Sequence, residues 1–185
     1  PDLMGFGRRN MNVSPAEAKA YIQYQLGALL AFCRASGVSM HHVKPHGALY
    51  NMAAKDEKLA RAIVEGICEV DDRLTLLALS GSEMLFAAEK AGLRAASEVF
   101  ADRAYQANGT LVPRSQPGAM ITDENEAIAR VVRMVTEGVV TSIDGIDVPL
   151  RADSICVHGD GAKALLFVQK IRQALGEKGV EIKAL

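Results

Sequence analysis

The sequence predicts an α/β fold built from parallel β/α units. Apolar runs of strand length alternate along the chain with segments of helical period. One of these runs, 74–79, is apolar almost throughout, as expected for a strand that is buried on both faces. The alternation favours parallel strands joined by helices, in either an open sheet or a barrel. No Gly-x-Gly-x-x-Gly follows a predicted strand, which argues against a dinucleotide-binding sheet.

The first half of the chain has strong signals for the ends of helices. Ser14 is suited to be an N-cap, Pro15 to the first helical position and Glu17 to closing a capping box, while Gly37 is suited to a C-terminal cap. A first helix is predicted from Pro15 to Ser36-Gly37. It is followed by a strand over 38–44, a helix over 55–70, a strand over 74–79 and a helix that begins within 80–83 and ends at Gly92.

The second half begins with a predicted strand over 95–103 and a long irregular segment over 104–120. Loops of that length within a compact domain are usually either functional or disordered. Asp144-Gly145 is the strongest short hairpin signal in the chain. The remaining predictions are a helix from Thr122, a β-hairpin insertion at about 139–150, a strand over 154–157, a helix over 161–175 and a strand over 180–185.

Length and composition define the class of protein. The chain has 185 residues, 49% of them apolar, which suits one compact domain with a substantial core. Its 21 basic and 22 acidic residues give a net charge of −1, without the basic stripe that nucleic acid requires. No apolar run is long enough to cross a bilayer, so we expect no membrane contact and a cytoplasmic location.

Polar clusters follow the carboxyl ends of three predicted strands. Lys44 and His46 follow the first strand, 98–103 lies along and after the third, and His158 follows the fourth. The carboxyl ends of parallel strands form the face where ligands bind in both barrels and open sheets. This shared position predicts an enzyme.

Lys44 and His46 stand beside Pro45 and Gly47 in the stretch VKPHGALYN. A lysine at the end of an apolar strand suggests a carboxylate or an anionic ligand nearby. Pro45 restricts the backbone and Gly47 permits a close approach, which favours a functional role. The alternative is a lysine whose ammonium reaches solvent from the rim of the sheet and a histidine that caps the turn.

Glu98, Asp102 and Arg103 lie along the third strand. The period of two puts Glu98 and Asp102 on one side and Arg103 on the other. Two carboxylates near a lysine and a histidine can separate their pKa values and serve as acid and base. The alternative is an internal ion pair that only closes the end of the sheet, and for Glu98 the two interpretations are equally supported.

The segment 105–115 supplies two further candidates for substrate binding, Tyr105 and Arg114. A guanidinium can grip a carboxylate or a phosphate with two parallel hydrogen bonds. The alternative is that Arg114 stays solvated on the loop.

His158, Gly159, Asp160 and Gly161 form a strand end, a glycine turn and the start of a helix. Free backbone N–H groups and the helix dipole suit a phosphate there, although Asp160 is equally suited to be an ordinary N-cap. The histidines and acidic residues form no tight motif such as His-Glu-x-x-His, so a divalent metal is not indicated.

Four motifs in order resemble the LamB/YcsF family: PDLMGFGRR, VKPHGALYN, SEVFADRAYQANGTLVPRSQPGAMI and SICVHGDGAKAL. The resemblance covers nearly the whole chain. It implies one β/α-barrel domain over 1–185, of the glycoside hydrolase and deacetylase type, and it implies that the first strands of the barrel precede this chain.

The same resemblance implies a component of ATP-dependent 5-oxoprolinase, a hydrolase that opens the cyclic amide 5-oxo-L-proline (pyroglutamate) to L-glutamate. ATP would be the co-substrate, two further subunits would be the partners, and a homo-oligomer is left open. The expected catalytic residues are Lys44, His46, Asp102 and His158. Arg103, Arg114, Glu98 and Tyr105 would bind substrate, and Gly159, Asp160 and Gly161 would bind phosphate. Two alternatives are a metal-dependent deacetylase-like hydrolase on the same barrel and a noncatalytic partner subunit.

Overall fold

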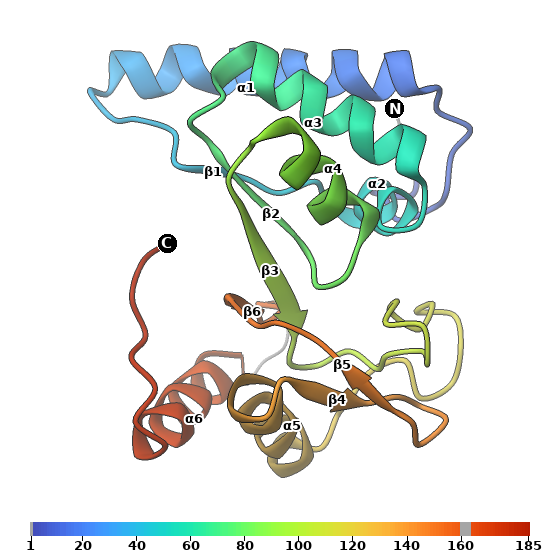
Figure 1. The fold of residues 1–185 in the computed structure, drawn as a ribbon, viewed down its shortest axis with the longest axis vertical. Helices are drawn as coiled ribbons and strands as arrows, with labels where there is room; N and C mark the ends of the chain where they lie inside the picture. Colours follow the sequence, from blue (N-terminus) through green and yellow to red (C-terminus); the bar gives the residue numbers. More distant parts are fainter. Residues whose placement is uncertain (1, 160–163) are drawn as a thin grey trace. The chain divides into compact units, whose positions relative to one another are not determined.

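The computed structural model describes residues 2–159 and 164–185. Helices and strands alternate in a mixed α/β fold, as the sequence predicts (Figure 1). The chain divides into two compact units, Pro1–Ser97 and Glu98–Leu185, and each is described by itself. The strand order of the main sheet is β1-β2-β3-β6, and β3 (Ala95–Phe100) crosses the boundary between the units. That this sheet is part of a β/α barrel, and that the chain is a single domain, stay predictions.

The first unit contains four helices and the paired strands β1 (His42–Val43) and β2 (Thr75–Leu79). These strands are parallel, with His42 opposite Thr75 and Val43 opposite Leu76. The helices are α1 (Pro15–Ala35), α2 (Gly47–Ala53), α3 (Glu57–Asp71) and α4 (Glu83–Ala91).

The predicted signals at the ends of the helices are present in the first unit. The amide of Glu17 donates to Ser14 Oγ at 3.2 Å, and the amide of Ser14 donates to Glu17 Oε2 at 2.9 Å, which completes the capping box of α1. Gly92 ends α4 in the left-handed conformation with φ of 70°. These local signals set the boundaries of the two helices.

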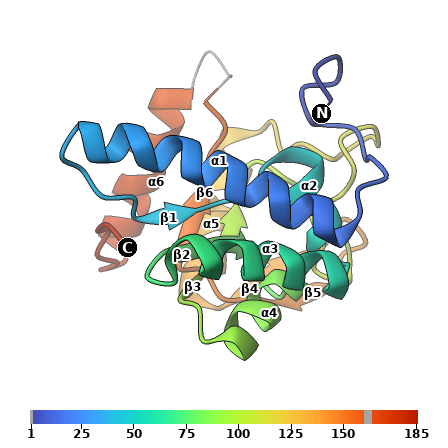
Figure 2. The same cartoon turned by 90° about the horizontal axis from the view of Figure 1, so that it is seen from above.

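Helices α1 and α3 run side by side in the first unit (Figure 2). Gly66 permits this approach, because a Cβ at that position would lie 3.1 Å from the carbonyl oxygen of Lys19. Lys19 also reaches across to α3, with Nζ 2.6 Å from Glu69 Oε1. The core below consists of apolar side chains that are almost fully buried: Ile22, Leu26, Ile63, Ile67, Leu76, Leu79 and Met84.

The second unit contains the strand β6 (Ser154–Cys156), which pairs in parallel with β3. Its other elements are α5 (Glu124–Thr136), β4 (Val139–Thr141), β5 (Asp147–Pro149) and α6 (Ala164–Glu177). One apolar cluster consists of Ala101, just after β3, Val131 of α5, and Ile171 and Leu175 of α6, and Ile155 of β6 packs against it. A second, smaller cluster lies under the 104–120 segment and consists of Ala104, Val112 and Ala119.

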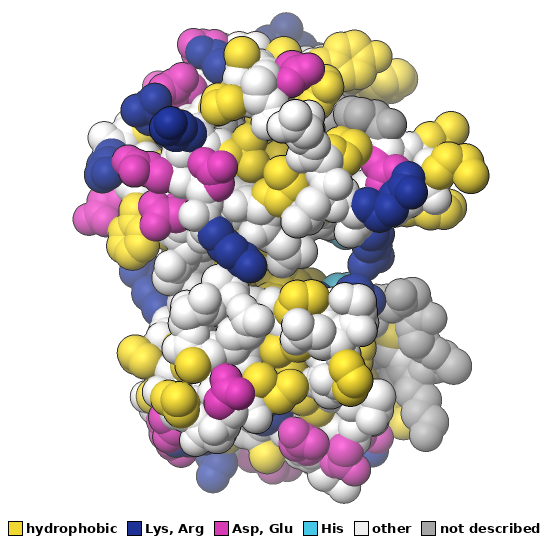
Figure 3. All heavy atoms as spheres, turned by 90° about the vertical axis from the view of Figure 1, so that its right-hand side faces the viewer, with side chains coloured by type: hydrophobic (Ala, Val, Ile, Leu, Met, Phe, Trp, Pro, Cys, Tyr) yellow, Lys and Arg dark blue, Asp and Glu magenta, His cyan; other side chains and the backbone are white. Residues whose placement is uncertain are grey.

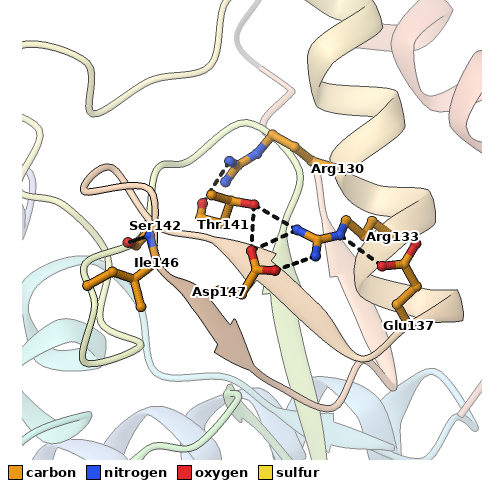
Figure 4. A network of polar contacts seen from close by, with 7 residues as sticks. All are labelled: Arg130, Arg133, Glu137, Thr141, Ser142, Ile146 and Asp147. Carbon is orange, nitrogen blue, oxygen red and sulfur yellow. Dashed lines mark hydrogen bonds and ion pairs between the residues drawn. The ribbon is translucent and has the colours of Figure 1, made fainter.

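The hairpin predicted from Asp144-Gly145 is confirmed. Strands β4 and β5 pair antiparallel, and Gly145 has φ of 78° in the turn between them. Arg133 of α5 ties this hairpin to the helix: its Nη1 donates to Asp147 Oδ1 at 2.9 Å and to Thr141 Oγ1 at 2.7 Å (Figure 4). The hairpin is therefore bonded to α5 through side chains.

The structure differs from the predicted elements in several places. Strand β3 ends at Phe100, so Asp102 and Arg103 lie after the strand and not within it, as the predicted 95–103 strand had them. Helix α2 begins at Gly47, where a turn was expected, and β1 is limited to two residues of the predicted 38–44 strand. The predicted strand over 180–185 is wrong, since this segment has no regular structure. Val180 instead packs against the apolar cluster of the second unit.

Acidic and basic side chains are interspersed on the face shown in Figure 3. Among residues 2–159 and 164–185, none of the helices combines the length and apolar character that a bilayer crossing requires.

Candidate functional site

Lys44 and His46 follow β1 directly in the first unit. Val43, the last residue of the strand, is 8% exposed, and Pro45 is buried as well. Lys44 is half-buried, with Nζ 5.7 Å from the centre of the Tyr50 ring, which is within the range of a cation–π contact. His46 is exposed and occupies the N-cap position of α2, but its side chain makes no capping hydrogen bond. Capping by this side chain, the alternative role for His46, is therefore absent.

Gly47 makes the close approach that the sequence predicts, and the approaching group is a backbone carbonyl of the same chain. A Cβ on Gly47 would lie 2.4 Å from the carbonyl oxygen of Gly7, and Gly47 has φ of 63°. The amide of Ala48 donates to the same oxygen at 2.7 Å. The PDLMGFGRR motif is thus docked on the VKPHGALYN motif within the first unit.

Asp102 and His158 meet in the second unit, although they lie 56 positions apart in the sequence. His158 Nδ1 is 2.7 Å from Oδ2 and 2.9 Å from Oδ1 of Asp102. Both side chains are largely buried, with exposed fractions of 20% for His158 and 15% for Asp102. The ring of Phe100 stacks on the imidazole at 6.0 Å between centroids. The imidazole is therefore held at one ring nitrogen and on one face.

Arg114 contacts the other ring nitrogen of the same histidine, with Nη2 3.0 Å from His158 Nε2. A guanidinium has only donors, so Nε2 must accept this hydrogen bond. The proton of a neutral imidazole then sits on Nδ1 and is donated to Asp102. Three predicted site residues thus form one chain of hydrogen bonds, and Arg114 is not merely a solvated loop side chain.

The carboxyl of Asp102 is kept in its charged form. Burial raises its pKa, but the hydrogen bond from His158, with a further contribution from the positive charge of Arg114, outweighs burial and lowers the pKa below its usual value. A carboxylate in this position favours the Nδ1–H tautomer of His158 and would stabilise an imidazolium. The arrangement has the geometry of a histidine base oriented by a carboxylate.

Three other predicted substrate-binding residues are buried in the second unit. Glu98 is 3% exposed, Arg103 is 5% exposed and Tyr105 is 1% exposed. Arg103 Nη2 donates to the carbonyl oxygen of Val112 at 2.6 Å, and the amide of Phe100 donates to the Tyr105 hydroxyl at 2.9 Å. Burial raises the pKa of Tyr105, so the phenol stays protonated. These contacts build the strand end and its loop, while substrate binding by the three residues stays a prediction.

The turn that carries Asp102 is held by donors from four separate segments. The carbonyl oxygens of residues 102, 103, 104 and 105 each accept a hydrogen bond from a different part of the second unit. The donors are Ile121 N at 2.9 Å, Arg130 Nη2 at 3.2 Å, Val112 N at 3.0 Å and Ile143 N at 2.8 Å. The backbone that positions Asp102 is therefore held by hydrogen bonds from four other segments of the second unit.

Arg130 is a residue that sequence reasoning missed. It projects from α5, and its Nη1 donates to the carbonyl oxygen of Thr141 at 3.2 Å (Figure 4). Its Nη2 donates to the carbonyl oxygen of Arg103. Burial lowers the pKa of its guanidinium. A polar residue within an amphipathic helix gives no sequence signal for such a contact. Its position in α5, close to Val131 of the core, was the only available hint.

The predicted phosphate-binding turn is described only at Gly159, and Asp160 and Gly161 lie outside the described residues. Within the described ranges, no three His, Cys, Asp or Glu side chains gather in a way that would hold a metal ion. Lys44 and His46 belong to the first unit, and Asp102, Arg114 and His158 belong to the second. That these residues share one site stays a prediction.

Comparison with known proteins places the chain among its relatives. The profile that describes the LamB/YcsF family matches residues 1–185. The A subunit of 5-oxoprolinase from Clostridium beijerinckii is 66% identical over 182 residues, which cover 98% of this chain and 71% of that protein. The protein of the same name from Bacillus subtilis is 55% identical over 185 residues, which cover 100% of this chain and 72% of that protein.

A solved structure is also similar. The crystal structure of the lactam utilization protein from Thermus thermophilus matches with a TM-score of 0.88 and 48% sequence identity, over 100% of this chain and 74% of that chain. The resemblance that four motifs predicted is therefore confirmed by sequence and by fold. Since the profile spans the whole chain and relatives are more than half identical, this chain belongs to the LamB/YcsF family.

Proposed function

We propose that this chain is a component of an ATP-dependent 5-oxoprolinase that opens 5-oxo-L-proline to L-glutamate together with two further subunits. Relatives that are 55% to 66% identical carry the name of the A subunit of 5-oxoprolinase, and a similar crystal structure carries the name lactam utilization protein. 5-Oxoproline is a five-membered lactam, so the two names agree in substrate class. The observation that carries the proposal is the Asp102–His158–Arg114 chain of hydrogen bonds.

A lactam carbonyl is a poor electrophile, and ATP would activate it. The carbonyl oxygen attacks the γ-phosphorus and ADP leaves. Water adds to the activated carbon, and the ring nitrogen takes a proton and leaves, which gives an acyl phosphate. A second water then releases phosphate and L-glutamate. The sequence of steps needs a base for water and cations for the phosphoryl and carboxylate charges.

His158 is suited to act as the base. Asp102 holds its Nδ1–H at 2.7 Å, so the lone pair of Nε2 is the site that can take a proton from water. The stacked Phe100 limits the rotation of the ring. The carboxylate of Asp102 would stabilise the positive charge that forms on the imidazole as the proton is transferred.

Arg114 is suited to couple the base to an anionic group of the substrate. Its guanidinium contacts Nε2 at 3.0 Å, so the lone pair is occupied in this arrangement. A carboxylate or phosphoryl oxygen is a stronger acceptor for a guanidinium than a neutral imidazole. Binding of the anion would draw Arg114 away and make Nε2 available to water. The base would thus be exposed when substrate is bound.

Lys44 and His46 would contribute from the first unit, as a cation and as a second titratable group. Their support is their position at the carboxyl end of β1 and the exposure of His46. Nucleotide binding by this chain is part of the proposal. Lys44 in the first unit and Arg114 in the second are each suited to bind a phosphate.

Reconstitution tests the proposal. The complete protein, combined with its two partner subunits, should form ADP in a manner that depends on 5-oxoproline. His158→Gln should lower kcat at least about 100-fold, because general base catalysis contributes roughly 100- to 10,000-fold. His41→Gln, an exposed histidine outside the site, is the matched control and should keep the wild-type rate.

Two results would contradict different parts of the proposal. A wild-type complex without turnover of 5-oxoproline would exclude the function. A working complex in which His158→Gln equals the wild type would leave the function in place but remove His158 from the chemistry.

A further inference from the structure

The PDLMGFGRR motif has no part in the proposed chemistry, yet it forms a constrained turn. The Asp2 carboxylate accepts from the amide of Gly5 at 3.1 Å and from the guanidinium of Arg9. The Asp2 side chain is only 5% exposed, and the hydrogen bond from Arg9 lowers its pKa. A Cβ on Gly5 would lie 2.2 Å from Asp2 Oδ2, so a larger residue there would displace the side chains that close the turn. Asp2 and Arg9 together close the turn.

The backbone of this turn is strained at one residue. Phe6 has φ of 52°, a conformation that residues other than glycine rarely adopt, and its side chain is 85% exposed. Burial of Phe6 does not offset that strain. Such strain persists where the surrounding structure imposes it, and it is concentrated at ligand-binding and catalytic sites. The turn is therefore held in one shape for a reason other than core packing.

The turn is docked beside Lys44 and His46 within the first unit. The carbonyl oxygen of Gly7 accepts from the amide of Ala48 at 2.7 Å. The Cβ position of Gly47 is also 4.0 Å from the backbone nitrogen of Arg8. Arg8 therefore starts next to the residue that follows His46, and its side chain is exposed.

The two adjacent arginines have different surroundings. The guanidinium of Arg9 is bound by Asp2. The guanidinium of Arg8 has no side-chain acceptor among the described residues, and only its backbone amide is engaged, donating to the Gly5 carbonyl at 2.9 Å. Lys44 and His46 add a cation and a titratable group to the segment against which the turn is docked. Arg8 thus brings a planar set of donors to a region that already carries positive charge.

We infer that Arg8 is an oxyanion-binding residue of the site that contains Lys44 and His46. The ligand is a planar or tetrahedral oxyanion, supplied by the carboxylate of 5-oxoproline or by a phosphoryl group of ATP. A guanidinium binds either group through two parallel hydrogen bonds, which an ammonium cannot do. This inference rests on the proposed function for the identity of the anion. The positioning of Arg8 rests on the contacts of the turn alone.

The test compares Arg8→Gln and Arg8→Lys with the wild type in the reconstituted complex. Arg61→Gln is the matched control, because Arg61 is an exposed arginine of the first unit that pairs with Glu65 on α3. If Arg8 binds the substrate carboxylate, Arg8→Gln raises the KM for 5-oxoproline about 10- to 100-fold and leaves turnover of 2-pyrrolidinone, which lacks the carboxylate, unchanged. If Arg8 binds the phosphoryl group, the KM for ATP rises instead. Arg8→Lys gives an intermediate value, and Arg61→Gln changes neither constant.

A direct measurement of anion binding makes the test independent of turnover. Titration calorimetry of the full chain with 5-oxoproline and with inorganic phosphate measures the anion site directly, and circular dichroism checks that each variant is folded. If Arg8→Gln loses anion binding while the wild type keeps it, the inference is supported, even if the wild-type complex fails to turn over 5-oxoproline. Equal binding and equal KM values in Arg8→Gln and the wild type would overturn it, and so would a wild-type chain that binds neither anion.

Discussion

His158 Nδ1 lies 2.7 Å from Asp102 Oδ2, and the guanidinium of Arg114 contacts the opposite nitrogen of the same ring. The imidazole is therefore bonded at both nitrogens, to an acceptor on one side and to a donor on the other. Its tautomer follows from the identity of these two partners.

Asp102→Asn is expected to lower kcat at least about 100-fold in the reconstituted complex, because it removes the charge that stabilises the imidazolium of His158. The KM values for 5-oxoproline and ATP should change far less. Steady-state kinetics measure both effects, and the nitrogen chemical shifts of His158 report the change of tautomer. Asp144→Asn is the matched control, since Asn-Gly suits the hairpin turn as well as Asp-Gly does. A kcat within twofold of the wild type would remove Asp102 from the mechanism.

Arg130→Met should loosen the turn that carries Asp102. It leaves the carbonyl oxygens of Arg103 and Thr141 without this donor, which costs about 1–3 kcal/mol in the free energy of unfolding. The value of kcat should fall as well, and Arg130→Lys should recover part of both losses. Urea denaturation and kinetics on the same preparations separate the two effects. An unchanged kcat alongside the loss of stability would show that Arg130 is purely structural.

Gly47→Ala should displace the N-terminal turn. The new Cβ would meet the carbonyl oxygen of Gly7 at 2.4 Å, and alanine is strained at φ of 63°. We expect a loss of about 1–3 kcal/mol in the free energy of unfolding and faster hydrogen exchange at Ala48. Gly81→Ala is the matched control, because Gly81 has φ of 73° but open space around the added Cβ. Equal losses in the two variants would show that the contact with Gly7 adds nothing.

The stability of the hairpin in the second unit should depend on pH through the carboxyl group of Asp147. Hydrogen bonds from Arg133 and Thr141 lower the pKa of Asp147 from 3.8 to about 2. The resulting stabilisation is present above pH 3.8 and is lost as the pH falls towards 2. Arg133→Met should return the Asp147 pKa towards 3.8, as measured by a carboxyl NMR titration. The difference in thermal stability between this variant and the wild type should shrink over the same pH range; a constant difference would contradict the linkage.

Local signals allowed much of the fold to be predicted. Ser14 and Glu17 specify the start of α1 within four residues, and Asp144-Gly145 specifies the hairpin in the same way. Helix α2 escaped prediction because its N-cap position holds His46, whose side chain does not cap the helix. The segment 180–185 was predicted to be a strand, but it has no regular structure and Val180 packs against the apolar cluster of the second unit. The helix start and the hairpin turn, which have local signals, were predicted correctly, whereas the short helix α2 and the irregular 180–185 segment were not.

In the candidate site, too, some features were predicted from the sequence and others were not. Asp102 and His158 were expected at strand ends, because each follows an apolar run, but their separation of 56 positions hid the contact itself. Arg130 could not be predicted, since its acceptors are backbone carbonyls that any sequence supplies. The tautomer of His158 likewise follows only from the positions of Asp102 and Arg114 in space.

The four hydrogen bonds to the carbonyls of residues 102–105 also bear on the order of folding. Their donors belong to residues 112, 121, 130 and 143, so the loop, α5 and the hairpin must all be in place before the turn is complete. Closing such distant contacts is slow relative to forming the local helices. We therefore expect the Asp102–His158 contact to appear late in refolding, which would keep a partly folded chain from exposing an active base.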